Sequence, residues 1–312
     1  MMFWFMAVVA ALSLVGGLIY RRLWIRIKGI DSTPTGYGAL LSVFLVGGMI
    51  YSQSPGDLIW SYALVAIATA IYWSDDVLGL GVKLRISIQF ASGFAVCYLL
   101  LAGTGLGLPL SMACCVAAGA LNIALTNVVN FTDGADLNLA LLMFFTATAI
   151  VLIGPDAAFM QPSALIILAF VLPFALFNCR PRTLYFGDSG CFVFASFLTI
   201  MTVCYFRNGS GQAAFAALPM ALPVYDAFYV FVTRVRNKED LLSRNYLHLY
   251  QKLQIKYRNF AYLLPQPLNV ALVLVSALAL QAVGLPSLFA VALAMLLATP
   301  IVYALYRKLF LR

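Results

Sequence analysis

Residues 1–28, MMFWFMAVVAALSLVGGLIYRRLWIRIK, decide the fold class of this chain. An apolar run fills residues 1–19, close to the roughly 20 residues that a helix needs to cross a hydrocarbon core about 30 Å thick. Four basic residues follow the run: Arg21, Arg22, Arg26 and Lys28. Positive charge after an apolar run, with none before it, is the reverse of a signal peptide. We therefore expect residues 1–19 to remain as a transmembrane helix.

The same pattern recurs along the chain, which is 63% hydrophobic and only 10% charged. Ordinary soluble domains are about 45–50% apolar and about 25% charged. We predict an all-α, polytopic integral membrane protein with about eleven transmembrane helices. The apolar runs cover residues 1–19, 37–53, 57–74, 87–104, 108–128, 138–154, 158–178, 189–206, 213–233, 263–283 and 285–306.

Basic residues fix the orientation of these helices, because positive charge stays on the cytosolic side of a membrane. When the loops alternate between the two sides, all of the 19 Lys and Arg residues except Arg207 fall on one side. We therefore expect the N-terminus outside, the C-terminus in the cytosol, and a bacterial inner membrane location. The net charge of +8 is then explained by topology and by attraction to anionic lipid rather than by nucleic-acid binding.

Polar residues concentrate at the cytosolic ends of the runs, and we expect one domain over residues 1–312 with its reactive groups at one membrane face. Asp75 and Asp76 close the third run. Adjacent helical carboxylates point about 100° apart, so each needs its own partner. They are either two solvated charges or part of a site. Because a helix C-terminus disfavours negative charge, we expect Lys83 and Arg85, or a divalent cation, to offset them.

A second polar stretch, NVVNFTDGADLNLA, covers residues 127–140. Asn127, Asn130 and Asp133 recur at three-residue spacing, which predicts one polar stripe on the last turns of a helix. Asp136 follows in the loop. Amide and carboxylate oxygens suit Mg²⁺ and can also hydrogen-bond a nucleobase or a sugar, although Asn and Asp are ordinary loop residues as well.

The third stretch, FNCRPRTLYFGDSGC, covers residues 177–191. We expect Asp188 to lie where the eighth helix begins, a position that favours anions but is also an ordinary N-cap. Gly187 and Gly190 are expected to let the backbone approach a ligand closely. Arg182 adds a cation beside them.

The longest inner loop, about residues 234–262, predicts an amphipathic helix with an apolar stripe from Leu242 to Phe260. Arg244, the single histidine His248, Gln251 and Lys252 are expected on its other side. Such a helix can lie in the headgroup plane and bring cations to a lipid phosphate. Carboxylates suited to Mg²⁺, cations and one His at a membrane face together indicate phosphoryl transfer, with a lipid phosphate as one reactant.

Short motifs in these stretches resemble those of the polyprenyl-phosphate N-acetylhexosamine-1-phosphate transferases, the glycosyltransferase family 4 membrane enzymes. The motifs are STPTGYG (32–38), Asp75-Asp76, NVVNFTDGAD (127–136), NCRPRTLYFGDSG (178–190) and LPVYD (222–226). The resemblance implies transfer of a sugar 1-phosphate from a UDP-N-acetylhexosamine to undecaprenyl phosphate, with release of UMP and a need for Mg²⁺ or Mn²⁺. The lone His in HLYQ (248–251) is similar to the branch that starts O-antigen and other surface polysaccharides.

The resemblance also implies residue roles. Asp188 and Asn130 would hold the metal, and Asp75 and Asp76 would lie by the lipid phosphate, one of them as base or nucleophile. His248 would be catalytic in the last cytosolic loop. The expected substrate-binding residues are Asn127, Asp133, Asp136, Lys83, Arg182 and Arg244. Cys191 stands where serine is common and Asn138 where glycine is common. The hexosamine, single or double displacement, and the oligomeric state, a homodimer included, stay open.

Two other classes compete with a transferase. A transporter or flippase for a phosphorylated lipid or nucleotide could use the same basic face without chemistry, but transporters place key ionisable groups near the midplane and commonly carry internal repeats. In this chain the acidic residues lie mostly at one face. A membrane phosphatase using a phosphohistidine would need more than the one histidine that the chain holds.

Overall fold

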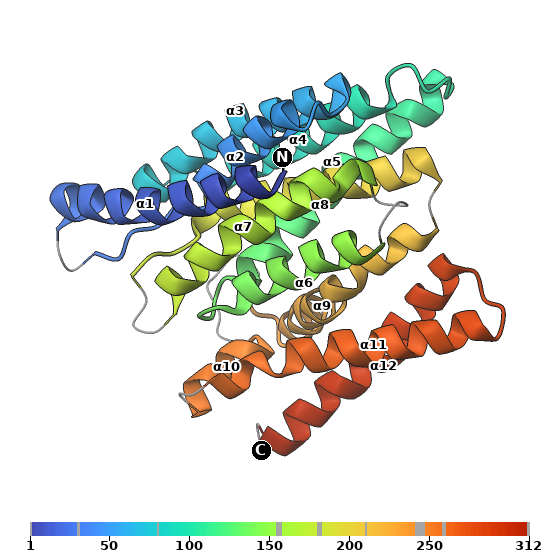
Figure 1. Cartoon of the computed structure of the whole chain (residues 1–312). Helices are drawn as coiled ribbons and strands as arrows, with labels where there is room; N and C mark the ends of the chain where they lie inside the picture. The colour runs from blue at the N-terminus through green and yellow to red at the C-terminus, as the bar shows by residue number, and fades with distance from the viewer. Residues whose placement is uncertain are drawn as a thin grey trace.

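A computed structural model of the chain describes residues 2–29, 32–79, 81–153, 158–179, 183–209, 211–240, 247–257 and 260–310 (Figure 1). These ranges are helical almost throughout, because backbone groups inside a bilayer must hydrogen-bond within the chain. The elements are α1 (Met2–Lys28), α2 (Ala39–Tyr51), α3 (Gly56–Leu78), α4 (Val82–Leu101), α5 (Leu108–Thr132), α6 (Asn138–Ile153), α7 (Gln161–Asn178), α8 (Gly187–Asn208), η2 (Gln212–Met220), α9 (Ala221–Arg236), α10 (Leu249–Tyr257), η3 (Phe260–Leu263), α11 (Pro265–Ala282) and α12 (Ser287–Phe310).

The helices confirm a polytopic membrane protein. Among the described residues, 9 helices are long and apolar enough to cross a membrane, and α2 and α6 are shorter apolar helices. Each apolar run in the sequence overlaps one of these segments. The number of crossings and the side on which each terminus lies remain predictions from the charge pattern.

Helix α8 forms the centre of the bundle, with α2, α3, α4 and α5 packed around it. Nearly all of its side chains are buried, including Phe192, Phe194 and Phe197. Polar side chains tie the neighbouring helices together at mid-depth. Asn122 of α5 donates a hydrogen bond to the Gln89 carbonyl of α4 at 2.8 Å and accepts one from the Thr199 hydroxyl of α8 at 3.1 Å. Such bonds stabilise helix contacts where no water is available.

The segment predicted as one span over residues 213–233 matches one candidate span, Ala214–Arg236, which starts as a 3₁₀ helix, η2, and continues as α9. Proline explains the irregular junction: Pro223 has no N–H to donate to the Pro219 carbonyl four residues before it. The Gln266 amide of α11 supplies the missing donor at 2.6 Å. This bond joins α11 to the start of α9.

Helices α11 and α12 pack against each other and against η2 and α9, and they form the outer edge of the bundle in Figure 1. The turn between them lies at the far end of the bundle from α10. Arg207 lies at this far end too, at the last turn of α8, where it pairs with Asp57 of α3 and donates to the Leu100 carbonyl. The stretches that carry Asp76, Asp133 and Asp188 lie at the other end, whereas the LPVYD motif lies in the first half of α9.

Candidate active site

Asp76, at the C-terminal end of α3, caps the N-terminus of α8. Its Oδ1 accepts the backbone N–H of Asp188 at 2.9 Å, and its Oδ2 accepts that of Ser189 at 3.1 Å. The hydroxyl of Thr35 lies 3.4 Å from the same Oδ1. The first amides of a helix carry partial positive charge, so this contact offsets the cost of a carboxylate at the end of α3. For Asp76 the amides of α8 therefore supply an offset that the sequence predicts from Lys83 and Arg85 or a divalent cation.

Glycine lets two motif loops cross backbone to backbone above this cap. Gly36 and Gly187 both have positive φ, 86° and 84°. A Cβ on Gly187 would overlap the backbone of Gly36 and would lie 2.8 Å from Asp76 Oδ1. A Cβ on Gly190 would come within 2.7 Å of the Gly38 Cα. The prediction that Gly187 and Gly190 admit a ligand is thus corrected: they admit the loop at residues 34–38.

Asp188 is the second residue of α8, as predicted, and its carboxylate faces Arg85 from the first turn of α4. Arg85 Nη1 donates to Asp188 Oδ2 at 2.9 Å, and both side chains keep about a third of their surface exposed. Lys83, the expected substrate-binding residue two positions earlier, is exposed to solvent. Sequence reasoning considered Arg85 only as a partner of the Asp75-Asp76 pair and missed its contact with Asp188.

The predicted polar stripe lies on the last turns of α5, which ends at Thr132. Asn127 is exposed and donates to the Ile123 carbonyl of its own helix at 2.8 Å, while Asn130 is half-buried. Asp133 follows as the helix C-cap. Asn127 and Asn130 therefore lie on the last turns of the helix, as the spacing predicts, and Asp133 lies just beyond its last residue.

The loop after α5 is held from several sides. Leu137 has a φ of 60° and donates its N–H to Asn178 Oδ1 at 2.7 Å, and Asn178 in turn donates to the Leu184 carbonyl at 3.1 Å. The Asp136 carbonyl accepts the Tyr262 hydroxyl at 2.8 Å. Asp136 itself is 3% exposed. Asn178 is the first residue of the NCRPRTLYFGDSG motif, and it connects this motif to the NVVNFTDGADLNLA stretch. The sequence did not reveal this role.

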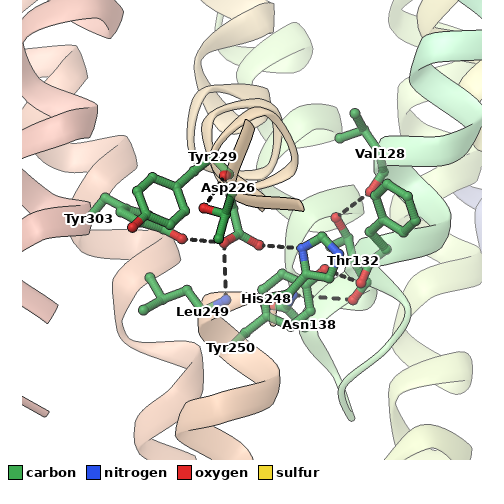
Figure 2. A network of polar contacts seen from close by, with 11 residues as sticks. Val128, Thr132, Asn138, Asp226, Tyr229, His248, Leu249, Tyr250 and Tyr303 are labelled. Atoms are coloured by element: carbon green, nitrogen blue, oxygen red, sulfur yellow. Dashed lines mark hydrogen bonds and ion pairs between the residues drawn. The ribbon is translucent and has the colours of Figure 1, made fainter. Parts of the chain in front are cut away.

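Asn138 closes the same loop. It begins α6, is buried, and donates from Nδ2 to the Thr132 carbonyl at 3.2 Å (Figure 2). A residue without a side-chain amide or similar donor could not make this bond. The residue in this chain therefore fixes the spacing between the end of α5 and the start of α6.

His248 lies immediately before α10 and is only 2% exposed. Its Nδ1 is 2.8 Å from Asp226 Oδ2 of α9 (Figure 2). Its ring stacks on Phe131 with centroids 4.8 Å apart and on Tyr250 with centroids 5.7 Å apart. The prediction that His248 projects from the polar side of an amphipathic helix is therefore wrong, because the ring points into the protein.

The apolar face of α10 packs against protein. Leu249, Tyr250 and Leu253 are buried beside Tyr303 of α12. Burial, with the nearby Asp226 charge adding to it, raises the pKa of Tyr250 well above its ordinary value. The hydroxyl thus stays protonated and donates to the Phe131 carbonyl. Within the described residues of the predicted stretch 234–262, this helix covers Leu249–Tyr257. Leu249 and Leu253 of the apolar stripe pack against protein rather than lipid, whereas Phe260 is 50% exposed.

Electrostatic contacts show that these groups share one corner of the bundle. The carboxylates of Asp76, Asp133 and Asp188 all act on the buried thiol of Cys191 in α8. Asp133 also acts on the Tyr250 hydroxyl, beside the His248 ring. The predicted Asp76, Asp133, Asp188 and His248 thus lie around a continuous region. Arg182 and Arg244 lie outside the described residues, as does the side chain of Asp75.

Asp226 is the main residue that sequence reasoning left without a role. It is 1% exposed and accepts hydrogen bonds from the Leu249 N–H at 3.0 Å and the Tyr303 hydroxyl at 2.9 Å, besides its contact with His248. An ionisable residue inside an apolar span is a signal of function in itself. Combined with a single histidine in the chain, that signal could have suggested the pair.

The oxygen donors of this corner fit a magnesium ion only if substrate supplies further ligands. Among the residues with described side chains, no group of three His, Cys, Asp or Glu lies close enough to hold a metal. Mg²⁺ commonly uses one or two carboxylates together with substrate phosphates and water. Asp188 and Asn130 match that donor chemistry, with Arg85 on the same Asp188 carboxylate as a competing cation.

Comparison with known proteins agrees with the motifs. Residues 58–206 match the glycosyl transferase family 4 sequence family. A relative from Bacillus subtilis (strain 168), described as "probable undecaprenyl-phosphate N-acetylglucosaminyl 1-phosphate transferase", is 21% identical over 136 residues. The similarity covers 42% of this chain and 38% of the relative. The matched region contains Asp76, Asn130 and Asp188 but ends before Asp226 and His248. On these similarities, residues 58–206 of the chain resemble glycosyl transferase family 4, and the chain matches less than half the length of this relative.

Proposed function

We propose that this chain transfers a sugar 1-phosphate from a UDP-N-acetylhexosamine to undecaprenyl phosphate at the cytosolic face of a bacterial inner membrane. The observation that carries the proposal is the gathering of Asp76, Asp133, Asp188, Arg85 and His248 at one end of a bundle of membrane helices. The printed description of the Bacillus relative supports the reaction type and the lipid acceptor. A first step of O-antigen or similar surface glycan synthesis is the expected context.

In the proposed reaction an oxygen of the lipid phosphate attacks the phosphorus that carries the sugar. A new P–O–P bond forms, the bond to the UMP phosphate breaks, and UMP leaves with the electron pair. A phosphate is already ionised at neutral pH, so this single displacement needs no strong base. A double displacement would need a free nucleophilic carboxylate. Both oxygens of Asp76 accept amide hydrogens, which favours a positioning role for it.

The remaining roles follow the chemistry of each side chain. Asp188 and Asn130 would hold Mg²⁺ on the pyrophosphate, and the ion would neutralise charge that develops on the leaving phosphate. Arg85, which contacts Asp188 at 2.9 Å, would bind a phosphate oxygen of the substrate. The expected contacts from Asp75, Lys83, Asn127, Asp133, Asp136, Arg182 and Arg244 belong to this proposal as well.

The experiment that tests the function is release of UMP from a panel of UDP-N-acetylhexosamines by the purified protein. Each reaction contains undecaprenyl phosphate and is run with and without Mg²⁺. We expect release from one donor that requires both the lipid and the metal, and none from the matched Asp188→Asn protein. If no donor gives UMP release while a control enzyme uses the same lipid, the proposal is overturned. Flux of lipid phosphate in vesicles without UMP release would instead support a transporter.

A further inference from the structure

Asp226 and His248 form a buried pair that the family match does not cover. The pair joins α9 to the start of α10, and both side chains are almost fully enclosed, at 1% and 2% exposure. His248 Nδ1 lies 2.8 Å from Asp226 Oδ2. An ionised carboxylate only accepts hydrogen bonds, so if Asp226 is ionised the proton in this contact belongs to Nδ1.

The carboxylate is itself held rigidly. Its Oδ1 accepts the Leu249 N–H from the first residue of α10 and the Tyr303 hydroxyl from α12. Three groups therefore contact this carboxylate: the Leu249 N–H of α10, the Tyr303 hydroxyl of α12, and Nδ1 of His248, the residue before α10. Figure 2 shows them converging on Asp226. Because the Asp226 carboxylate is fixed in this way, it can hold the His248 ring in one orientation.

Two aromatic rings also stack on the imidazole, and one of its nitrogens has no hydrogen-bond partner among the described residues. Phe131, at the end of α5, and Tyr250 stack on the imidazole. His248 Nε2 is buried and has no hydrogen-bond partner among the residues that the structure describes. A buried polar atom without a partner costs about 1–3 kcal/mol. Such atoms in native proteins usually meet a ligand or water.

The stacking places this atom beside the polar end of α5. Phe131 lies between Asn130 and Asp133 in the second motif, and Asp133 is close enough to act electrostatically on Tyr250. In Figure 2 the ring lies between Asp226 on one side and the end of α5 on the other. The ring nitrogen that is not bound by Asp226 is therefore directed to the region where the proposed phosphates would bind.

We propose that Asp226 is a positioning residue, which fixes the proton of His248 on Nδ1 and presents Nε2 to a substrate phosphate group. The substrate part of this inference rests on the proposed function, whereas the state of the ring does not. The phosphate could belong to the nucleotide or to the lipid. Nothing in the inference requires a covalent step at the histidine.

The chain's single histidine allows a direct test. Protein labelled with ¹⁵N-histidine and reconstituted in lipid nanodiscs gives the two ring signals of His248 alone. We expect Nδ1 to be protonated in the native protein, and the ring signals to change in Asp226→Asn. A native ring protonated on Nε2 alone, or signals unchanged in Asp226→Asn, would overturn the proposal.

Asp57→Asn provides the matched control. Asp57 is the second residue of α3, and at about 1.5 Å per residue it lies about 29 Å from Asp76 along the same helix. Asp57→Asn removes one negative charge, as Asp226→Asn does, but from the ion pair with Arg207 at the opposite end of the bundle. The ring signals should not respond to it.

Two ligands distinguish the source of the phosphate. UMP with Mg²⁺, or a short-chain prenyl phosphate, is added to the labelled protein. A shift of the Nε2 signal with UMP assigns the nucleotide phosphate, and a shift with the prenyl phosphate assigns the lipid. No shift with either, at concentrations where ³¹P spectra show binding, would overturn the substrate contact.

Kinetics then separate positioning from general structure. We expect His248→Gln to lower kcat about 10²–10⁴-fold and Asp226→Asn to lower it at least about 10-fold, with little change in KM. If Asp226 acts through His248, adding Asp226→Asn to His248→Gln costs nothing more. A full additional loss in the double variant would contradict the proposal. If the native protein has no turnover, the proposed function fails, and the ring experiment still decides the role of Asp226.

Discussion

Asp76 and Asp226 are both carboxylates that accept an amide hydrogen from the start of a helix, yet their other partners differ. Asp76 binds two backbone N–H groups of α8 and lies under the crossing of two glycine loops. Asp226 binds one backbone N–H, a phenol and the only imidazole of the chain. Asp76 therefore fixes backbone, whereas Asp226 fixes the side chain of His248, which we propose contacts the substrate. Changes at the first should cost stability, and changes at the second should cost activity.

A third carboxylate, Asp188, binds an arginine rather than a helix, and its removal should have the largest effect on turnover among the carboxylates of the site. Asp188→Asn should lower turnover about 10²–10³-fold, or about 3–4 kcal/mol of transition-state stabilisation, because charge on the transferred phosphate loses its support. UMP release and the thermal unfolding midpoint are measured on the same preparation. The midpoint should stay close to native. Substantial turnover of this variant at normal Mg²⁺ would remove Asp188 from the metal assignment.

The loop crossing gives the largest effect on stability. Gly187→Ala places a methyl group against the Gly36 backbone at a φ of 84°, and we expect a loss of about 3 kcal/mol from strain and overpacking together. Gly81→Ala is the matched control, since Gly81 has open space around it and a φ of −68°. Thermal unfolding in detergent compares the two. Equal midpoints for both variants would mean that the crossing is looser than described.

Replacing Asp76 and Asp226 by Asn, one at a time, tests whether the two carboxylates have different roles. Asp76→Asn keeps one acceptor oxygen and loses a charged bond to α8, which should lower stability by about 2 kcal/mol. The ¹⁵N signals of His248 should not change in this variant, whereas they change in Asp226→Asn. If Asp76→Asn altered the imidazole as strongly, the two sites would have to be one cooperative unit.

The smallest effect concerns the phenol on Asp226. Tyr303→Phe removes one of three hydrogen bonds to the carboxylate and should cost about 1 kcal/mol of stability. The Nδ1 proton of His248 should remain, because its own contact with Asp226 is untouched. A ring that changes state in Tyr303→Phe would show that the phenol, and not the carboxylate alone, orients it.

Local chemistry in the sequence predicted much of this site. Apolar run lengths predicted the helices, and Asp188 at the start of α8 followed from the Gly-Asp-Ser pattern. The break before α9 was also readable from Pro219 and Pro223, although a continuous span was expected. These features depend on residues close together in the chain.

Contacts between distant segments could not be predicted in the same way. Gly187 was correctly seen as a place of close approach, but the sequence does not say that Gly36 is the neighbour. Asp226 and His248 are separated by a loop, so their contact depends on how α9 and α10 pack. The amphipathic stripe of α10 predicted an apolar partner, and only packing decides between protein and lipid.

The crossing of Gly36 and Gly187 has a mechanical consequence. The loop at residues 34–38 follows α1, whose side chains are mostly exposed to the surroundings, and the same loop contacts the first residue of the most enclosed helix, α8. A change in bilayer thickness that tilts α1 would therefore reach the tip of α8 without an intervening side chain to absorb it. Turnover in vesicles of increasing acyl length should pass through an optimum, and a flat response would show that the two loops move independently.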